Sequence, residues 1–107
     1  MNALQHFKKL ASSFTDTVEM PHFEKTSFRI NKKIFATLHA THQSACLKLS
    51  PADQSVYCQV APGTAYPVNN KWGKQGWTMV NLEDIKINIL EEVVTKAYVN
   101  TVNKCSP

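Results

Sequence analysis

The stretch TSFRINKKIFATLH, residues 26–39, predicts the centre of the fold. Its first part alternates apolar with polar side chains, which is the pattern of a strand with one buried and one exposed face. After Asn31, Lys32 and Lys33, residues 34–39 resume in β-forming side chains. We therefore expect an antiparallel hairpin with the two lysines at its exposed tip.

Further strands are expected on the C-terminal side of this hairpin. Residues 45–49 follow a polar stretch and read as a third strand, the next neighbour in a meander. Residues 77–80 read as a last strand, after an irregular stretch that Pro62, Gly63 and Pro67 punctuate.

Three segments have the features of helices. Apolar residues recur at steps of three and four from Leu4 to Phe14, which predicts an amphipathic helix. Ser50, followed by a proline and an aspartate, predicts the start of a helix over residues 51–60. Asn81 and Asp84 resemble a capping box that opens a long helix with a broad apolar face.

These elements predict an α+β fold, in which an antiparallel sheet is covered on one face by the N- and C-terminal helices. The chain has 107 residues, which is too short to form two separate stable hydrophobic cores. We therefore expect a single domain over residues 1–107.

The composition indicates a globular chain that is mildly basic. It is 43% hydrophobic and 19% charged, with a net charge of +4. No apolar run approaches the roughly 20 residues that cross a bilayer, and the first residues lack the order of a signal peptide. We expect a cytoplasmic protein without a membrane partner, and the basic residues concentrate in the middle of the chain.

Metal and cofactor sites are not expected. Cys46, Cys58 and Cys105 form no C-x-x-C pair and read as idle thiols. His39, His42 and Cys46 lie close in sequence, but positions three apart on a strand face opposite sides. We interpret these histidines as solvated turn residues.

Catalysis also lacks a recognisable constellation. The sequence has no nucleophile on a sharp glycine turn and no glycine loop for phosphates. Glu91 and Glu92 are adjacent on a helix and point in different directions. We expect binding rather than chemistry, and an enzyme is the least supported class.

Two further segments contain candidate binding residues. His22 and Glu24 would face the same side of an extended segment, where they would orient a ligand or cap a turn. In KWGKQGW, residues 71–77, two tryptophans stand beside two glycines and two lysines. Such tryptophans are more often packing residues, whereas the neighbouring lysines favour the alternative of contacts to bases and phosphates.

The stretches PHFEKTSFRINKKIFATL (21–38) and YPVNNKWGKQGWT (66–78) resemble the MmcQ/YjbR family of bacterial proteins. LKLSP (47–51) and Ala97-Tyr98 match as well, so the resemblance covers almost the whole chain. It implies a fold like that of bacterial frataxin and a DNA-binding function, described as a double-wing arrangement. Iron handling like that of frataxin is not expected, because Lys8 and Lys9 stand where an acidic ridge would be needed. The residues that match the family's motifs are His22, Arg29, Lys33, Lys48, Lys71, Trp72 and Trp77.

Two functional hypotheses result. In the first, the chain binds DNA, and the contacts come from Arg29, Lys32, Lys33, Lys48, Lys71, Trp72 and Lys74. In the second, it binds a small anion or a protein partner in a pocket formed by His22, Arg29, Trp72 and Trp77. The first requires that the cations share one outer surface.

Overall fold

The predicted hairpin forms in the computed structural model, which describes residues 3–14, 16–22, 25–30, 32–69 and 71–105, and only the backbone of residues 22 and 103–105. Strands β2 (Lys25–Ile30) and β3 (Lys33–His39) pair antiparallel. Lys32 has a φ of 71° in the turn, and Lys32 and Lys33 are exposed. Asn31, which precedes the two lysines of the expected tip, lies outside the described residues.

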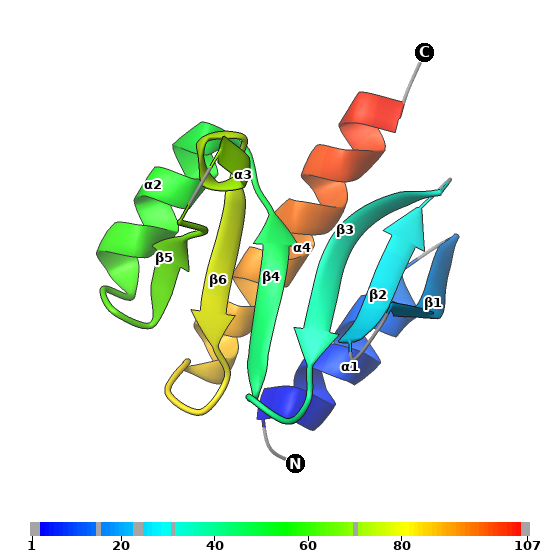
Figure 1. Ribbon diagram of the computed structural model, residues 1–107, viewed down its shortest axis with the longest axis horizontal. Coiled ribbons are helices and arrows are strands. Elements are labelled where there is room, and N and C mark those ends of the chain that lie inside the picture. The colour runs from blue at the N-terminus through cyan, green and yellow to red at the C-terminus, as the bar shows by residue number, and fades with distance from the viewer. Residues whose placement is uncertain (1–2, 15, 23–24, 31, 70, 106–107) are drawn as a thin grey trace.

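The hairpin belongs to a six-stranded sheet in which all neighbouring strands are antiparallel (Figure 1). Its order is β1-β2-β3-β4-β6-β5. The predicted third and last strands are confirmed. The strands besides the hairpin are β1 (Thr17–His22), β4 (Ser44–Lys48), β5 (Ala65–Pro67) and β6 (Trp77–Asn81).

The two outermost strands were not expected from the sequence, and proline explains why. Pro21 lies in β1 and Pro67 in β5, and each strand pairs on one side only. A proline has no N–H to donate, so it is tolerated at a sheet edge. Both segments therefore form edge strands despite a breaker residue.

Helices α1 (Ala3–Ser13) and α4 (Ile87–Cys105) cover one face of the sheet, as predicted (Figure 1). The aromatic rings of the core join these layers. Phe7 of α1 meets Phe28 of β2 edge to face, with 5.6 Å between ring centroids. Phe14 stacks on Tyr98 of α4 at 4.3 Å. Phe7 and Phe28 are fully buried, and Phe14 and Tyr98 are partly buried against the same core. Burial of such rings supplies much of the stability of a small domain.

Helix α2 (Pro51–Val60) starts as the sequence predicts. The Ser50 hydroxyl accepts a hydrogen bond from the backbone N–H of Asp53 at 3.1 Å, and Pro51 occupies the first turn. Tyr57 turns inward, and its hydroxyl donates to Glu92 of α4 at 3.3 Å. The segment after α2, for which the sequence predicts irregular structure, contains a short helix, α3 (Lys71–Lys74).

The predicted capping box at Asn81 is wrong. Asn81 is the last residue of β6, and α4 begins only at Ile87. The Asn81 side chain accepts from the Glu83 N–H at 2.9 Å and donates to Asp84 at 3.1 Å. The same side-chain chemistry that caps a helix here closes a turn, because asparagine bonds to the backbone two residues on in both settings.

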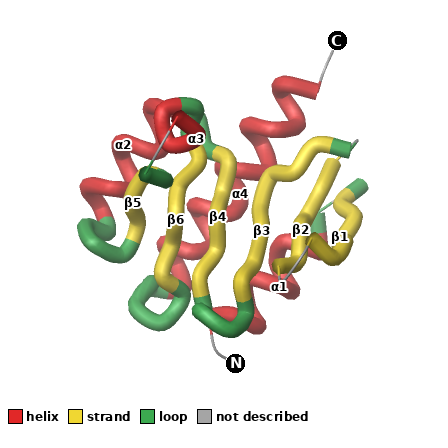
Figure 2. Tube along the Cα trace, viewed as in Figure 1, coloured by secondary structure: helices red, strands yellow, loops and turns green. Residues whose placement is uncertain are grey.

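The other face of the sheet, which we call the outer face, carries no described helix (Figures 1 and 2). Strand pairing assigns side chains to it, since directly opposed residues share a face. One row crosses all six strands: Met20, Ser27, Thr37, Cys46, Met79 and Tyr66.

Candidate functional site

All of the predicted DNA-binding residues lie at one end of the sheet, which we call the basic end. The β2–β3 turn is here, and β4 runs antiparallel to β3, so Lys48 at the end of β4 also arrives here. Trp77, the first residue of β6, pairs with Lys48. Gln75 and Gly76 connect α3 to β6, and Figure 1 shows these two elements at the same end of the sheet. The members are Arg29, Lys32, Lys33, Lys48, Lys71, Trp72, Lys74 and Trp77.

Lys48 and Trp77 form the middle of the basic end. They are cross-strand partners, and the Lys48 ammonium lies 5.7 Å from the centroid of the Trp77 ring. The same ammonium donates a hydrogen bond to the backbone carbonyl of Gln75. Trp77 is half-buried. This lysine therefore fastens the tryptophan loop to the sheet as well as adding charge.

Trp72 is more exposed than a packing residue would be, since 48% of its surface is accessible. The Lys71 ammonium lies 5.8 Å from its ring centroid, within the range of a cation–π contact. Beside them lies an open depression of about 770 Å³. Its lining consists of Gln54, Pro67, Val68, Asn69, Lys71, Gly73 and Lys74.

Two glycines allow this loop to lie against neighbouring backbone. A Cβ atom at Gly73 would meet the Val68 carbonyl oxygen at 1.9 Å, and one at Gly76 would meet the Leu49 carbonyl oxygen at 1.8 Å. The Gln54 side chain of α2 adds hydrogen bonds to the carbonyl oxygens of Gly73 at 2.9 Å and Trp77 at 3.1 Å. The loop is thereby held on its inner side, and the lysines remain at the surface.

Arg29 is held on the outer face by a short chain of hydrogen bonds. Its Nε donates to the Ser27 hydroxyl at 3.1 Å, and that hydroxyl donates to the Met20 carbonyl at 3.1 Å. One strand separates Arg29 from Lys48, which corresponds to about 10 Å across the sheet. The two cations are thus neighbours on the same surface.

The cations of the basic end have few described carboxylates beside them. Among the described residues, no carboxylate lies within ion-pair distance of Arg29, Lys32, Lys33, Lys71 or Lys74. In the described part of the chain, His6 Nε2 of α1 lies 2.9 Å from Glu91 Oε1 of α4, away from the basic end. Arg29 and Lys48 share the outer face, whereas Lys33 is opposed to the buried Ile30 and therefore lies on the other face, so the first hypothesis stays a prediction.

The residues of the second hypothesis do not come together in one pocket. The backbone of His22 pairs with Lys25, at the opposite end of the β1–β2 ladder from Arg29. Trp72 and Trp77 lie beyond β4, near the other edge of the sheet. Glu24, the suggested partner of His22, lies outside the described residues.

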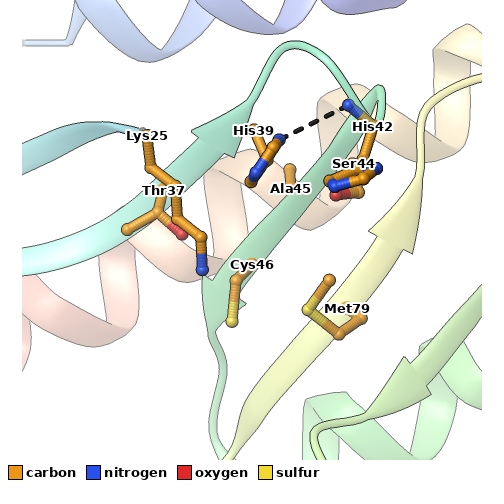
Figure 3. A pocket seen from close by; sticks show the side chains of 8 residues that line it. All are labelled: Lys25, Thr37, His39, His42, Ser44, Ala45, Cys46 and Met79. Atoms are coloured by element: carbon orange, nitrogen blue, oxygen red, sulfur yellow. Dashed lines mark hydrogen bonds between the residues drawn. The ribbon is translucent and has the colours of Figure 1, made fainter. Parts of the chain in front are cut away.

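A pocket that sequence reasoning missed lies on the outer face, at the opposite end from the tryptophans (Figure 3). It measures about 310 Å³ and is lined by Lys25, Thr37, His39, His42, Ser44, Ala45, Cys46 and Met79. Our argument from positions three apart on one strand does not apply, because His39, His42 and Cys46 belong to β3, a turn and β4. In the described part of the chain, no group of three His, Cys, Asp or Glu side chains is arranged to hold a metal ion.

The Cys46 thiol in this pocket is protonated at neutral pH. Burial raises the pKa of Cys46 from 9.0 to about 11, and the nearby Lys25 ammonium lowers it to a smaller extent. A neutral thiol is a poor nucleophile and a poor metal ligand. The strand register Thr37–Cys46 is the signal that could have revealed this grouping, and a single sequence does not fix it.

No described helix is long and apolar enough to cross a membrane. The comparison with curated proteins found no match. Among solved structures, the chain is similar to the Deinococcus radiodurans protein DR2400, whose family-model domain is DUF419. The TM-score is 0.85 at 18% sequence identity, with 100% of this chain and 83% of that chain covered, which establishes a shared fold. The family model YjbR matches residues 12–100, and the chain therefore belongs to the YjbR family.

Proposed function

We propose that this chain is a non-catalytic DNA-binding domain that contacts DNA with its basic end. The observation that carries the proposal is the meeting of cations and two tryptophans, from separate segments, at one end of the sheet, with Arg29, Lys48 and Trp77 on the face that no described helix covers. The cations that lack a described carboxylate partner are available for phosphates. Binding is then mainly electrostatic and falls as salt rises.

The residues of the basic end take different roles in this proposal. Lys32 and Lys33 on the hairpin tip and Lys71 and Lys74 beside the depression meet phosphates. Trp72, at 48% exposure, offers a ring face on which a base stacks. Lys48 contributes less directly, because its ammonium already bonds to the Gln75 carbonyl.

The geometry favours single-stranded DNA over a duplex. A recognition helix must be long enough to lie in the major groove, and α3 at the basic end has only four residues. An open sheet with exposed aromatic and basic side chains instead suits unpaired bases. Unpaired bases expose the ring faces on which Trp72 can stack.

Fluorescence anisotropy of a labelled oligonucleotide of about 20 nucleotides tests the proposal. We expect micromolar binding at low salt, tighter for the single strand than for the same sequence as a duplex, with an affinity that decreases linearly on a log–log plot against salt. Quenching of tryptophan fluorescence should accompany binding. Absence of binding to both forms at low salt would overturn the proposal.

A further inference from the structure

The pocket at the other end of the outer face has its own chemistry. We call it the lysine–histidine pocket and define it by Lys25, His39, His42, Cys46 and Met79 (Figure 3). Its volume of about 310 Å³ is at the lower end of the range in which proteins bind small molecules. It shares no lining residue with the depression at the basic end.

The hollow exists because small side chains lie between long ones. Thr37 and Cys46 are paired across β3 and β4 on the outer face. Lys25 and Met79, from the strands on either side, have longer side chains and form the walls. Figure 3 shows the Lys25 side chain extending across Thr37 toward Cys46.

The β3–β4 turn closes one end of the pocket and fixes its histidines. Gln43 adopts a φ of 47°, and its N–H donates to the Ala40 carbonyl at 3.1 Å. The backbone N–H of His42 donates to Nδ1 of His39 at 3.4 Å, so neutral His39 carries its proton on Nε2. The two rings are in contact, with 4.2 Å between centroids. The β3–β4 turn thus holds His42 at the mouth of the pocket.

The side chains at the mouth of the pocket, which we call the rim, and those at its floor suit chemically different parts of a ligand. Lys25 supplies a positive charge, and in the described residues it has no ion-pair partner. His42 supplies an N–H donor. The floor is the Cys46 thiol, and the Met79 thioether forms the wall beside it; both groups are neutral and polarisable. A cationic rim above a neutral floor repels a metal ion and attracts an anion.

We propose that the lysine–histidine pocket binds a small organic carboxylate with a compact apolar body. The carboxylate accepts hydrogen bonds from the Lys25 ammonium and the His42 imidazole, and the apolar body contacts Cys46 and Met79. This site is separate from the basic end and does not depend on DNA binding.

Benzoate is a suitable probe, and benzyl alcohol is its uncharged counterpart. In a ¹H–¹⁵N titration of the full chain, benzoate should shift the amide signals of residues 37–46 and of Met79, in a saturable manner. Benzyl alcohol should shift them far less, because it cannot form the charge-assisted hydrogen bonds. Inorganic phosphate, added separately, tests whether the apolar body is needed, and we expect weaker binding than for benzoate.

Two variants assign the binding to the named side chains. Lys25→Met keeps the apolar stem and removes the charge, and His42→Phe keeps a ring against His39 and removes the donors. Each should weaken benzoate binding about tenfold, the effect of one charge-assisted hydrogen bond. Lys32→Met, an exposed lysine at the basic end, is the matched control and should leave benzoate binding unchanged.

The outcomes separate this proposal from the previous one. Benzoate shifts that appear at the basic end, that benzyl alcohol reproduces, or that persist in both pocket variants would each overturn the pocket proposal. DNA binding should be the same in His42→Phe as in the unaltered chain, so a failure of one proposal leaves the other measurable.

Discussion

Lys48 and Trp77 face each other across β4 and β6, with the lysine ammonium 5.7 Å from the indole centroid and bonded to the Gln75 carbonyl. This pair joins the sheet to the loop that carries the exposed Trp72. The Lys48 side chain therefore both adds positive charge to the basic end and holds the loop that carries the tryptophans. Because other lysines of the basic end face the solvent, substitutions can distinguish their role from that of Lys48.

Replacement of Lys48 by methionine should affect stability more than DNA binding. The change removes a hydrogen bond to the Gln75 carbonyl and a cation–π contact, together worth about 1 kcal/mol. We expect the urea midpoint to fall measurably, while DNA affinity falls by less than about threefold. A large loss of affinity with unchanged stability would show that this ammonium acts mainly on phosphates.

The double substitution of Lys71 and Lys74 by glutamine should affect binding and leave stability almost unchanged. Both side chains are exposed, and the removal of each lysine–phosphate interaction should reduce the slope of log affinity against log salt by about 1. Anisotropy titrations at several salt concentrations measure both effects. The double substitution of Lys86 and Lys96, two other exposed lysines, is the control for net charge. If both double substitutions reduced DNA affinity equally, DNA binding would depend only on the net charge of the chain.

Much of the fold could be predicted because the hydrophobic pattern is local. The alternation in residues 26–39 predicted the central hairpin, and Ser50 predicted the start of α2. Edge strands β1 and β5 were missed, because Pro21 and Pro67 argue against strands unless the strand is known to lie at an edge. Asn81 misled the prediction of α4 because a turn and a helix cap use the same side-chain bonds.

The residues of the basic end could be picked out from the sequence, but their common position in the fold could not be predicted. The sequence shows basic residues near two tryptophans, but their common position depends on β4 running antiparallel to β3 and pairing with β6. The lysine–histidine pocket was not predictable at all. It arises from cross-strand neighbours such as Thr37 and Cys46, and that register is set by packing of the whole sheet.

Gly76→Ala should destabilise the chain strongly. Gly76 has a φ of 106°, and an added Cβ would meet the Leu49 carbonyl oxygen at 1.8 Å, so the substitution strains both the backbone and the packing. We expect the free energy of unfolding to fall by about 3 kcal/mol. Gly63→Ala is the control, because Gly63 has a φ of 79° with nothing within 4 Å of the added atom. It should cost only about 1 kcal/mol. Urea unfolding of Gly76→Ala and Gly63→Ala compares a variant that has the clash with one that does not. Equal losses of unfolding free energy in the two variants would contradict the clash at Gly76.

Phe35 should be the costliest aromatic residue to truncate. Its ring is fully buried and meets the rings of Phe14 and Tyr98 edge to face, at 6.4 and 5.8 Å. Phe35→Ala should cost about 4 kcal/mol, since it leaves a cavity beside Phe14 and Tyr98 of α4. Phe35→Leu fills most of that space and should cost about 1.5 kcal/mol. If the two variants unfolded at the same urea concentration, the ring would not have the packing role that its burial indicates.

The Cys46 thiol should make stability decrease at alkaline pH. Its pKa is 9.0 without burial and about 11 in the folded chain. Between these values the unfolded state has released the thiol proton and the folded state still holds it, so the unfolded state binds fewer protons and stability falls as pH rises. This contribution is fully present below pH 9.0 and is lost by about pH 11.

Cys46→Ala isolates that contribution, because Cys58 and Tyr57, whose pKa values burial also raises, remain in both proteins. Unfolding by urea under reducing conditions, from neutral pH to the alkaline limit, should show the stability advantage of the unaltered chain over the variant shrinking by up to about 2 kcal/mol. An advantage that stayed constant over this range would mean that the thiol ionises equally well in the folded chain, and that the floor of the pocket is open to water.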